Sequence, residues 1–346
     1  MSPVNPFTLE FGVKPPEYID RYAETTAILE DFSSPFPSTH LYALLGPRGC
    51  GKTVMLNNVI ERTGKKENWI SVILNCKGDL LLQLAAALDE KVRSRLPKLT
   101  AEFSFSFSFL SVSLKGKEPV SDIHVLLRKM FGVLDKHGTK VLVAIDDVAI
   151  NEYVEVFAKE FQILRGNHMP IFLVMTGLYS TFNKLENSEG LTFLLRTPKV
   201  YLGPLNEKAI ASTYKTVLGI SQEKAMKLAA FTKGYAFAYQ CLGFLLVKHN
   251  KADLDEDVLE KLDYYLEEGV YNKLWDELSP KEKSIVRFIA DKGEATNQEL
   301  IDAGLTEGNN ISNYKNSLRR KGVLTTPARG IVSLALPRFG EFVNCL

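Results

Sequence analysis

The sequence has few of the features that mark secreted, membrane-bound or zinc-binding proteins. Its four cysteines, Cys50, Cys76, Cys241 and Cys345, are scattered over 346 residues without C-x-x-C spacing or companion histidines. This pattern argues against a zinc site and is typical of a reducing compartment. No apolar run approaches the roughly 20 residues that a membrane span needs, and the first residues lack a charged segment followed by an apolar one. We therefore expect a soluble, cytoplasmic protein.

The sequence also has no excess of charge of either sign. It contains 42 Lys and Arg residues against 41 Asp and Glu residues, a formal net charge of +1. The overall charge therefore gives no indication of a nucleic-acid or membrane partner, and any basic surface has to be local. Because the length exceeds what one compact core usually holds, we expect two or three domains. Residues 1–17 carry four prolines and predict an extended arm on the surface.

A phosphate-binding pattern lies near the start of the chain. The apolar segment Leu41–Leu45 runs directly into residues 46–53, with the sequence GPRGCGKT. In this P-loop pattern the glycines let the backbone aim N–H groups at a phosphate, and the following helix adds its positive end. Lys52 is predicted to reach the β- and γ-phosphates, and the Thr53 hydroxyl to hold Mg²⁺. The predicted nucleotide-binding residues here are Gly46, Pro47, Arg48, Gly49, Cys50, Gly51, Lys52, Thr53 and Val54.

A second pattern is a buried strand that ends in two carboxylates. Val141–Ile145 is a continuous apolar run, typical of a parallel strand covered on both faces, and Asp146 and Asp147 follow it. Open α/β sheets bind ligands at this end of their strands. In a P-loop protein, Asp146 is predicted to hold Mg²⁺ through water, as the Walker B acid. Asp147 is predicted to act as the base for an attacking water.

Two further candidates each have a structural alternative. Thr176 follows the third buried strand, Ile171–Met175, where it either senses a γ-phosphate or simply ends the strand. Arg196 precedes the last strand of this region and is either a surface residue or an arginine finger that enters a neighbouring subunit's site. Both are retained as candidate catalytic residues, together with Lys52 and Asp147.

An unusual segment, residues 103–114, alternates Phe and Ser for most of its length. A period of two predicts a half-buried strand or hairpin. Either its Phe face packs on the domain, or its edge is offered to a protein partner. We expect a β-hairpin insertion over about residues 102–115.

Residues 206–275 show only helix signals and predict an all-α lid domain. Residues 235–240 open one of these helices, and their aromatic side chains either lean over a nucleotide or belong to the core. The predicted caps or turn residues are Ser212, Ser221 and Asp253, and the predicted interruptions are Gly234 and Gly243.

The last part of the chain predicts a winged helix-turn-helix. Three helices, over about residues 280–292, 297–303 and 310–321, precede two strands over 323–326 and 331–336. Amide and guanidinium groups on the outer face of the third helix are able to pair with base edges. The residues predicted to face DNA are Ser312, Asn313, Asn316, Arg319, Arg320 and Arg329.

The charge of this winged helix leaves two interpretations open. From Ser279 onward the chain has ten Lys and Arg residues against seven Asp and Glu residues. This surplus is small for a DNA-binding domain, since phosphate contacts dominate the affinity for DNA. Winged helices also serve as protein-docking modules.

The order of these motifs resembles the AAA+/STAND ATPases, and most closely the archaeal and bacterial ATPases allied to origin-recognition initiators. The resemblance covers nearly the whole chain, including residues 11–21 (FGVKPPEYIDR). It implies an α/β P-loop NTPase with a parallel sheet in the order 5-1-4-3-2, an all-α lid and a C-terminal winged helix. ATP or ADP, with Mg²⁺, is implied between the sheet and the lid. Arg21 and the backbone near Tyr18 and Ile19 are implied beside the adenine.

Three departures limit what this resemblance implies. Asp147 stands where AAA+ motors carry Glu, and its shorter side chain suits a slow STAND switch better. Residues 233–237 contain no arginine where initiators place their second sensor. The Gly-x-Pro motif of many STAND proteins is not evident, although Gly203-Pro204-Leu205 lies at a similar place.

We therefore expect a P-loop ATPase domain over residues 1–204, a lid over 205–276 and a winged helix over 277–346. One hypothesis is a slow ATPase whose nucleotide state is coupled to a winged helix that contacts double-stranded DNA. The other is a nucleotide-gated signalling switch that turns over rarely. Its winged helix and Phe/Ser hairpin would bind protein partners or mediate self-association.

Overall fold

The computed structural model describes residues 5–10, 12–100, 102–103, 121–305 and 310–346. The predicted Phe/Ser hairpin lies outside these residues, apart from its first two positions. The chain forms two compact units. The sheet unit comprises Arg21–Leu45 and Lys52–Tyr201, and the helical unit comprises Met1–Asp20, Gly46–Gly51 and Leu202–Leu346.

The sheet unit is built on five parallel strands in the order β2-β3-β4-β1-β5. This confirms the predicted order, read from the opposite edge. In the register of the strands, Leu45 at the end of β1 pairs with Gly177 of β4, and Ile145 at the end of β3 pairs with Met175. The carboxyl ends of these strands therefore lie at one edge of the sheet. The strands are β1 (Leu41–Leu45), β2 (Trp69–Leu74), β3 (Lys140–Ile145), β4 (Ile171–Gly177) and β5 (Lys199–Tyr201).

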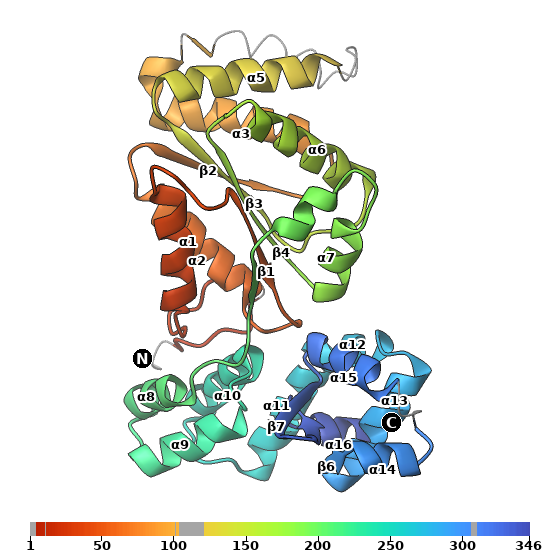
Figure 1. Cartoon of the computed structure of the whole chain (residues 1–346). Helices are drawn as coiled ribbons and strands as arrows, with labels where there is room; N and C mark the ends of the chain where they lie inside the picture. Colours follow the sequence, from red (N-terminus) through yellow and green to blue (C-terminus); the bar gives the residue numbers. More distant parts are fainter. Residues whose placement is uncertain (1–4, 11, 101, 104–120, 306–309) are drawn as a thin grey trace. The chain divides into compact units, whose positions relative to one another are not determined.

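Helices cover both faces of this sheet, as Figure 1 shows: α1 and α2 lie on one side, and α3, α5 and α6 on the other. Successive strand residues point to opposite faces, so a strand covered on both sides is apolar throughout. In β3 the residues from Val141 to Ile145 are all fully buried. The helices are α1 (Tyr22–Ser33), α2 (Lys52–Gly64), α3 (Leu80–Arg95), α5 (Ser121–Lys136), α6 (Glu152–Gly166) and α7 (Tyr179–Glu186), with short 3₁₀ segments at Pro97–Leu99 and Thr192–Arg196.

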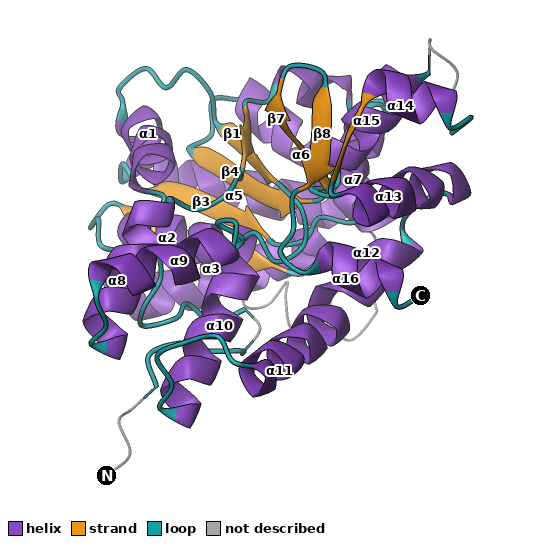
Figure 2. Cartoon of the chain, turned by 90° about the horizontal axis from the view of Figure 1, so that it is seen from below, coloured by secondary structure: helices purple, strands orange, loops and turns teal. Residues whose placement is uncertain are grey.

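From Leu202 onward the helical unit contains the predicted lid helices, followed by a part with a small antiparallel sheet in the order β6-β8-β7, seen in Figure 2. The three predicted helices and the two wing strands are present, but β6 and α16 were not predicted. The lid contains α8 (Glu207–Leu218), α9 (Gln222–Phe231), α10 (Ala236–His249), α11 (Glu256–Leu266), a π-helical turn (Glu267–Tyr271) and α12 (Asn272–Asp276). The last part contains α13 (Pro280–Lys292), β6 (Glu294–Thr296), α14 (Asn297–Asp302), α15 (Ile311–Arg320), β7 (Leu324–Ala328), β8 (Ile331–Leu334) and α16 (Phe339–Asn344).

One of the three predicted caps or turn residues of the lid was wrong. Ser212 lies inside α8, which Asn206 caps by accepting N–H groups of the first turn. Asp253 lies in a bend of the connection before α11, in agreement with a turn residue, and the cap of that helix is Asp255. Ser221 caps α9 as predicted. Similar short polar side chains compete for each cap, so the sequence places a helix better than its first residue.

The N-terminal arm has no helix or strand in its described residues, but it does not lie wholly on the surface. Phe7 is 2% exposed, and its ring centroid lies 5.5 Å from that of Tyr239 and 5.8 Å from that of Tyr214. Gly243, predicted as an interruption, lies within α10, where a Cβ atom would come within 2.6 Å of the Phe7 ring. The glycine therefore makes room for an aromatic side chain from the arm.

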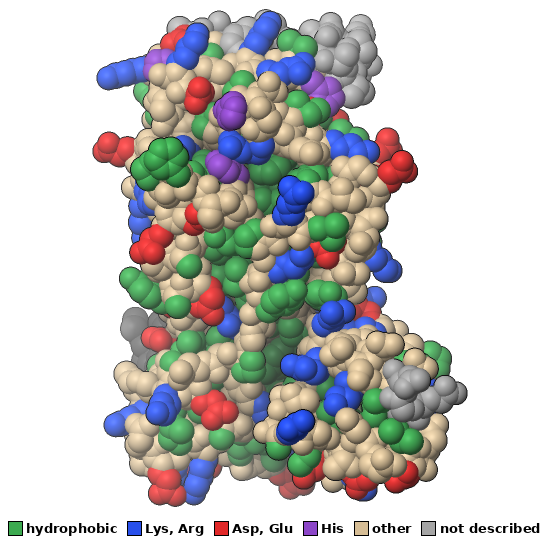
Figure 3. Space-filling model, in the orientation of Figure 1, with side chains coloured by type: hydrophobic (Ala, Val, Ile, Leu, Met, Phe, Trp, Pro, Cys, Tyr) green, Lys and Arg blue, Asp and Glu red, His purple; other side chains and the backbone are tan. Residues whose placement is uncertain are grey.

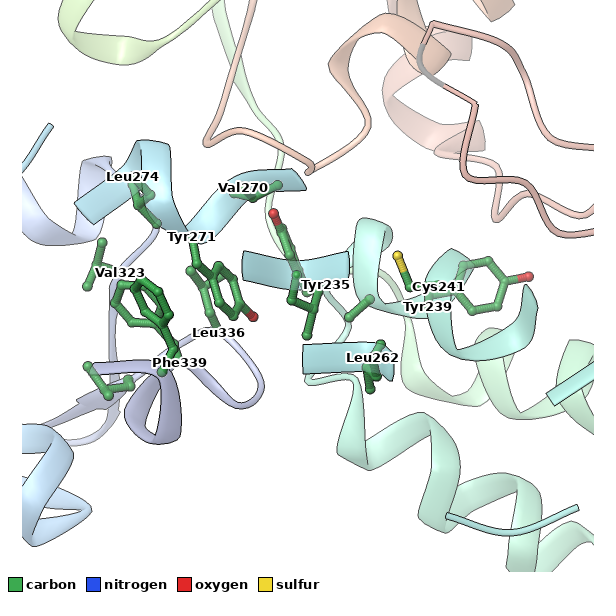
Figure 4. Packing of buried hydrophobic residues seen from close by; sticks show 14 of the residues in the cluster. Tyr235, Tyr239, Cys241, Leu262, Val270, Tyr271, Leu274, Val323, Leu336 and Phe339 are labelled. Carbon is green, nitrogen blue, oxygen red and sulfur yellow. The ribbon is translucent and has the colours of Figure 1, made fainter. Parts of the chain in front are cut away.

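A single cluster of buried apolar side chains runs through the helical unit. Figure 4 shows its middle, where Tyr271 and Phe339 lie side by side with ring centroids 4.9 Å apart. The Tyr271 hydroxyl donates to the carbonyl of Pro337. The lid and the winged helix thus share one core. Within the described part of the chain, no helix is long and apolar enough to cross a membrane.

Candidate nucleotide site

The P-loop occupies the connection between β1 and α2, as the motif requires. Gly49 and Gly51 have φ angles of +69° and +93°, in the left-handed region that favours glycine. Gly49 also has no room for a side chain, since a Cβ atom would lie 2.2 Å from the Tyr235 hydroxyl oxygen. α2 begins at Lys52, so the first N–H groups of this helix follow the loop directly.

Two hydroxyl groups of the sheet unit hold the carboxylate of Asp146, and one of them also accepts the backbone N–H of Asp147. The Thr53 hydroxyl donates to Asp146 Oδ2 over 2.8 Å, and the Thr176 hydroxyl donates to Asp146 Oδ1 over 2.5 Å. Thr176 Oγ1 also accepts the backbone N–H of Asp147 over 2.9 Å. Thr176 is fully buried, and its hydroxyl group fixes the carboxylate of Asp146 and the backbone N–H of Asp147. The sequence suggested sensor and strand-end roles for Thr176 but not this bridge, because β3 and β4 are neighbours only in the folded sheet.

Asp147 differs from Asp146 in backbone and exposure. Its φ angle is +49°, which is uncommon for a residue other than glycine. Its side chain is exposed, whereas that of Asp146 is partly buried. A carboxylate in this position can accept a proton from a water molecule at the carboxyl edge of the sheet.

The oxygen atoms around Asp146 suit Mg²⁺. This ion usually keeps several waters and is bound by one or two carboxylates together with substrate phosphates. One carboxylate and one hydroxyl, 2.8 Å apart, match that requirement. No group of three or more His, Cys, Asp or Glu side chains able to hold a metal occurs among the described residues.

The predicted adenine-contacting residues fall in different units. Tyr18 and Ile19 belong to the helical unit, where the Lys14 ammonium lies 4.5 Å from the centroid of the Tyr18 ring. Just before them, the carbonyl of Glu17 accepts a hydrogen bond of 2.7 Å from the Gln240 side chain. Arg21 belongs to the sheet unit, where it is the N-cap residue of α1.

Arg196 is the last residue of the 3₁₀ segment before β5, and its side chain is exposed. This placement agrees with both the surface role and the arginine-finger role predicted from the sequence.

Residues far along the chain form hydrogen bonds and an ion pair with the P-loop. The Tyr235 hydroxyl donates to the carbonyl of Arg48 over 2.9 Å, and the Phe237 N–H donates to the carbonyl of Gly49 over 3.1 Å. The Arg48 guanidinium forms an ion pair of 3.0 Å with Glu277. Tyr235 and Phe237 were noted in the sequence as aromatic residues opening a helix, but neither their contact with the loop nor that of Glu277 had a local signal.

The candidate DNA-facing side chains are all exposed. On the opposite face of α15, Ile311 and Leu318 are buried and Tyr314 is partly buried. Figure 3 shows Lys and Arg side chains gathered over α15 and β7. The exposed residues are Ser312, Asn313, Asn316, Arg319 and Arg320 of α15 and Arg329 of the wing turn.

Lys321, at the end of the same basic run, is used within the winged helix. Its ammonium donates to Glu282 Oε2 over 2.7 Å and to the carbonyl of Glu277 over 3.0 Å. Glu282 is 3% exposed and also accepts the Ser317 hydroxyl over 2.6 Å. Lys321 is therefore occupied within the winged helix, which leaves Arg319 and Arg320 as the exposed cations of this run, while the net surplus of charge is unchanged because Glu282 is paired with it.

Comparison with known proteins agrees with this architecture. A family model described as "Domain of unknown function (DUF8462)" matches residues 268–343, and no curated protein matches the chain. Among solved structures, a Walker-type ATPase of Pyrococcus abyssi has a TM-score of 0.64 at 15% identity. The match covers 98% of this chain and 99% of that one. The ORC2 protein of Aeropyrum pernix, in its ADPNP-ADP complexes, has a TM-score of 0.58 at 16% identity, covering 97% and 96%. The chain thus shares its fold, over nearly its whole length, with an archaeal Walker-type ATPase and an archaeal ORC protein.

Proposed function

We propose that this protein binds ATP or ADP together with Mg²⁺ at residues 46–53 and hydrolyses ATP slowly. The observation that carries the proposal is the hydrogen bond of 2.8 Å between Thr53 and Asp146, with Thr176 on the other carboxylate oxygen. These residues are distant in sequence, and their convergence after a P-loop is the arrangement that a Mg²⁺-nucleotide requires. The similar ORC2 protein was solved in ADPNP-ADP complexes, which supports an adenine nucleotide.

Each residue has a distinct role in this proposal. Lys52 neutralises the β- and γ-phosphates, and the loop N–H groups bind their oxygens. Thr53 and Asp146 hold Mg²⁺, which offsets negative charge on the phosphates when bound. Asp147 orients the attacking water and accepts its proton, while Arg196 is available to a neighbouring subunit's site. Tyr18, Ile19 and Arg21 flank the adenine.

Slow turnover is expected from Asp147. An aspartate side chain is one methylene shorter than the glutamate of AAA+ motors, and Thr176 fixes the backbone N–H of Asp147. The carboxylate therefore has little freedom to reach a water that a longer side chain would contact. A protein that retains its nucleotide for long periods suits a switch better than a motor.

We further propose that the nucleotide state is coupled to the winged helix, which contacts double-stranded DNA through α15 and the wing. The support is the exposed Asn and Arg face of α15 and the basic surface over α15 and β7 in Figure 3. Arg319, at the end of α15, also lines a pocket of about 400 Å³ whose walls include Pro47 of the P-loop.

The alternative is a switch whose winged helix binds proteins. The observation that favours it is the internal use of Lys321, whose ammonium is paired with the buried Glu282 carboxylate and is therefore not available to a DNA phosphate. DNA binders normally rely on phosphate neutralisation by several such groups.

Calorimetry with Mg²⁺ and either ADP or ATP tests the nucleotide proposal. Wild type is expected to bind both, Lys52→Ala to lose binding, and Asp146→Asn to bind with a much weaker Mg²⁺ dependence. Asp147→Asn is expected to bind ATP but not to hydrolyse it. Retained affinity in Lys52→Ala would refute the proposed phosphate site.

Binding of a labelled duplex across a salt series, with ATP, ADP or no nucleotide, separates the two hypotheses. For the DNA hypothesis, Arg319→Glu with Arg329→Glu should weaken binding and reduce the salt slope by roughly 2. A control with the same change of charge, Lys208→Glu with Lys215→Glu on α8, should leave the slope unchanged. The absence of duplex binding in every nucleotide state would favour the protein-docking switch.

A further inference from the structure

We infer that the lid shapes the P-loop from its outer side: Tyr235 and the Phe237 N–H hold two loop carbonyls so that the following N–H groups turn toward the nucleotide's phosphates. Tyr235 is thus a positioning residue for phosphate binding. The inference rests on the proposed nucleotide function and adds to it a specific route between the lid and the phosphate site.

The lid supplies two hydrogen-bond donors to the P-loop, the Tyr235 hydroxyl and the Phe237 N–H. Tyr235 is the N-cap residue of α10, is 6% exposed, and donates its hydroxyl to the carbonyl of Arg48 over 2.9 Å. Phe237 is the second residue of α10, so its N–H group has no acceptor within its own helix. It donates instead to the carbonyl of Gly49 over 3.1 Å. The start of α10 therefore completes its hydrogen bonding on the P-loop.

The geometry of the peptide group determines where the neighbouring N–H groups point. In a planar trans peptide the C=O of one residue and the N–H of the next point in opposite directions. The peptide bonds of the described residues are trans. A carbonyl of Arg48 held toward Tyr235 therefore directs the N–H of Gly49 away from the lid donors. In the same way, the carbonyl of Gly49 held by α10 directs the N–H of Cys50 away from them.

These are the groups on which a P-loop depends, because its N–H groups have to converge on the anion without reorganising. Two hydrogen bonds on the outer side thus preorganise two donors on the inner side. The left-handed Gly49 permits the close approach, since no side chain separates the loop from the Tyr235 hydroxyl. Burial raises the pKa of Tyr235 well above its usual value, so the hydroxyl remains a donor at any physiological pH.

The winged helix contacts the same stretch of the loop. Glu277 pairs with the Arg48 side chain over 3.0 Å, and a Cβ atom on Gly322, just after α15, would lie 2.5 Å from the Pro47 ring. A change in the shape of residues 47–49 would therefore be transmitted to both α10 and the end of α15. This route needs no arginine in residues 233–237, which is where the sequence lacks one.

The test is the affinity for ADP of Tyr235→Phe, measured by calorimetry with Mg²⁺ on the full chain. Loss of one hydrogen bond that orients the loop should raise the dissociation constant of ADP about 3- to 10-fold. Tyr214→Phe is the matched control. Tyr214 is another fully buried lid tyrosine, and its hydroxyl donates to the carbonyl of Tyr239 over 2.8 Å, away from the P-loop. It should lower the lid's thermal stability by a similar amount and leave the ADP affinity unchanged.

The outcomes separate the two proposals. If wild type binds ADP, Lys52→Ala does not, and Tyr235→Phe binds ADP as tightly as Tyr214→Phe, the positioning role is refuted while the nucleotide site stands. Equal weakening by both tyrosine variants also refutes it, because a general loosening of the lid would then explain the effect. If wild type binds no ADP, the proposed nucleotide function fails, and the inference fails with it.

Discussion

The packing of Phe7 against Gly243 predicts that the effect of Gly243→Ala on the stability of the helical unit depends on the Phe7 ring. The substitution should destabilise the unit when the ring is present and stabilise it when the ring is removed. Gly243 lies inside α10, where alanine is favoured over glycine by about 1 kcal/mol. A Cβ atom there would come within 2.6 to 2.7 Å of three carbons of the Phe7 ring. Overpacking of this kind costs about 1–3 kcal/mol, so Gly243→Ala should destabilise the helical unit by up to about 2 kcal/mol in total.

Removal of the ring should reverse that effect. Phe7→Ala alone should cost about 3–5 kcal/mol, because a fully buried aromatic side chain is lost from the lid core. In the Phe7→Ala background the clash is gone, and Gly243→Ala should stabilise the unit by about 0.5–1 kcal/mol through helix propensity. The double-mutant cycle should therefore give a coupling free energy of about 1–3 kcal/mol, which is the overpacking cost alone because the helix propensity cancels.

Urea unfolding followed by tryptophan fluorescence measures these changes. Trp275 belongs to the same buried cluster as Phe7, whereas Trp69 belongs to the sheet unit. A Trp69→Phe background makes Trp275 the sole reporter and follows the helical unit. Equal destabilisation by Gly243→Ala with and without the Phe7 ring would refute the idea that the arm fills this space.

Two other predictions concern the sheet unit. Burial, with a smaller contribution from Arg165, lowers the pKa of His40 to about 4, and its ring stacks on Phe172. In the unfolded chain the imidazole of His40 has a pKa of about 6.5, so the unfolded state binds the proton more readily than the folded state. The free energy of unfolding should therefore fall by about 1–2 kcal/mol as the pH is lowered from 6.5 to 4. This figure is reduced because the side chain is partly exposed. His40→Gln should flatten this pH dependence in thermal unfolding, while His168→Gln at an exposed site should not; unchanged behaviour of His40→Gln would contradict the assignment. Asp79 caps α3 by accepting two N–H groups at 2.9 and 3.0 Å. Asp79→Ala should cost about 1 kcal/mol and Asp79→Asn less, measured by urea unfolding with Trp69 as reporter, and equal costs would argue against the cap.

The sequence predicted those parts of the molecule that depend on neighbours along the chain. The strand, loop and helix around residues 46–53 follow from an apolar run, glycines at fixed spacing and a helical pattern, all within about two dozen residues. The order of the sheet was implied by a resemblance that rested on the sequence of motifs. The outer face of α15 followed from helical periodicity alone, because the period of 3.6 residues separates Leu318 from Arg319 without reference to the rest of the fold.

Features that join distant segments were decided by the tertiary structure. Thr176 orients Asp146 and Asp147 because β3 and β4 are adjacent in the sheet. Lys321 is removed from the basic surface because Glu282, on another helix, faces it.

The same holds for two contacts made by α10 and its N-cap residue. Phe7 enters the lid where α10 has a glycine, and Tyr235 reaches a P-loop carbonyl nearly 190 positions earlier in the chain. The local sequence around a glycine or a tyrosine in a helix does not identify the side chain or carbonyl that it contacts in the folded protein. Only close packing in three dimensions selects that partner, which is why the chemistry of the motif was predictable and its control by the lid was not.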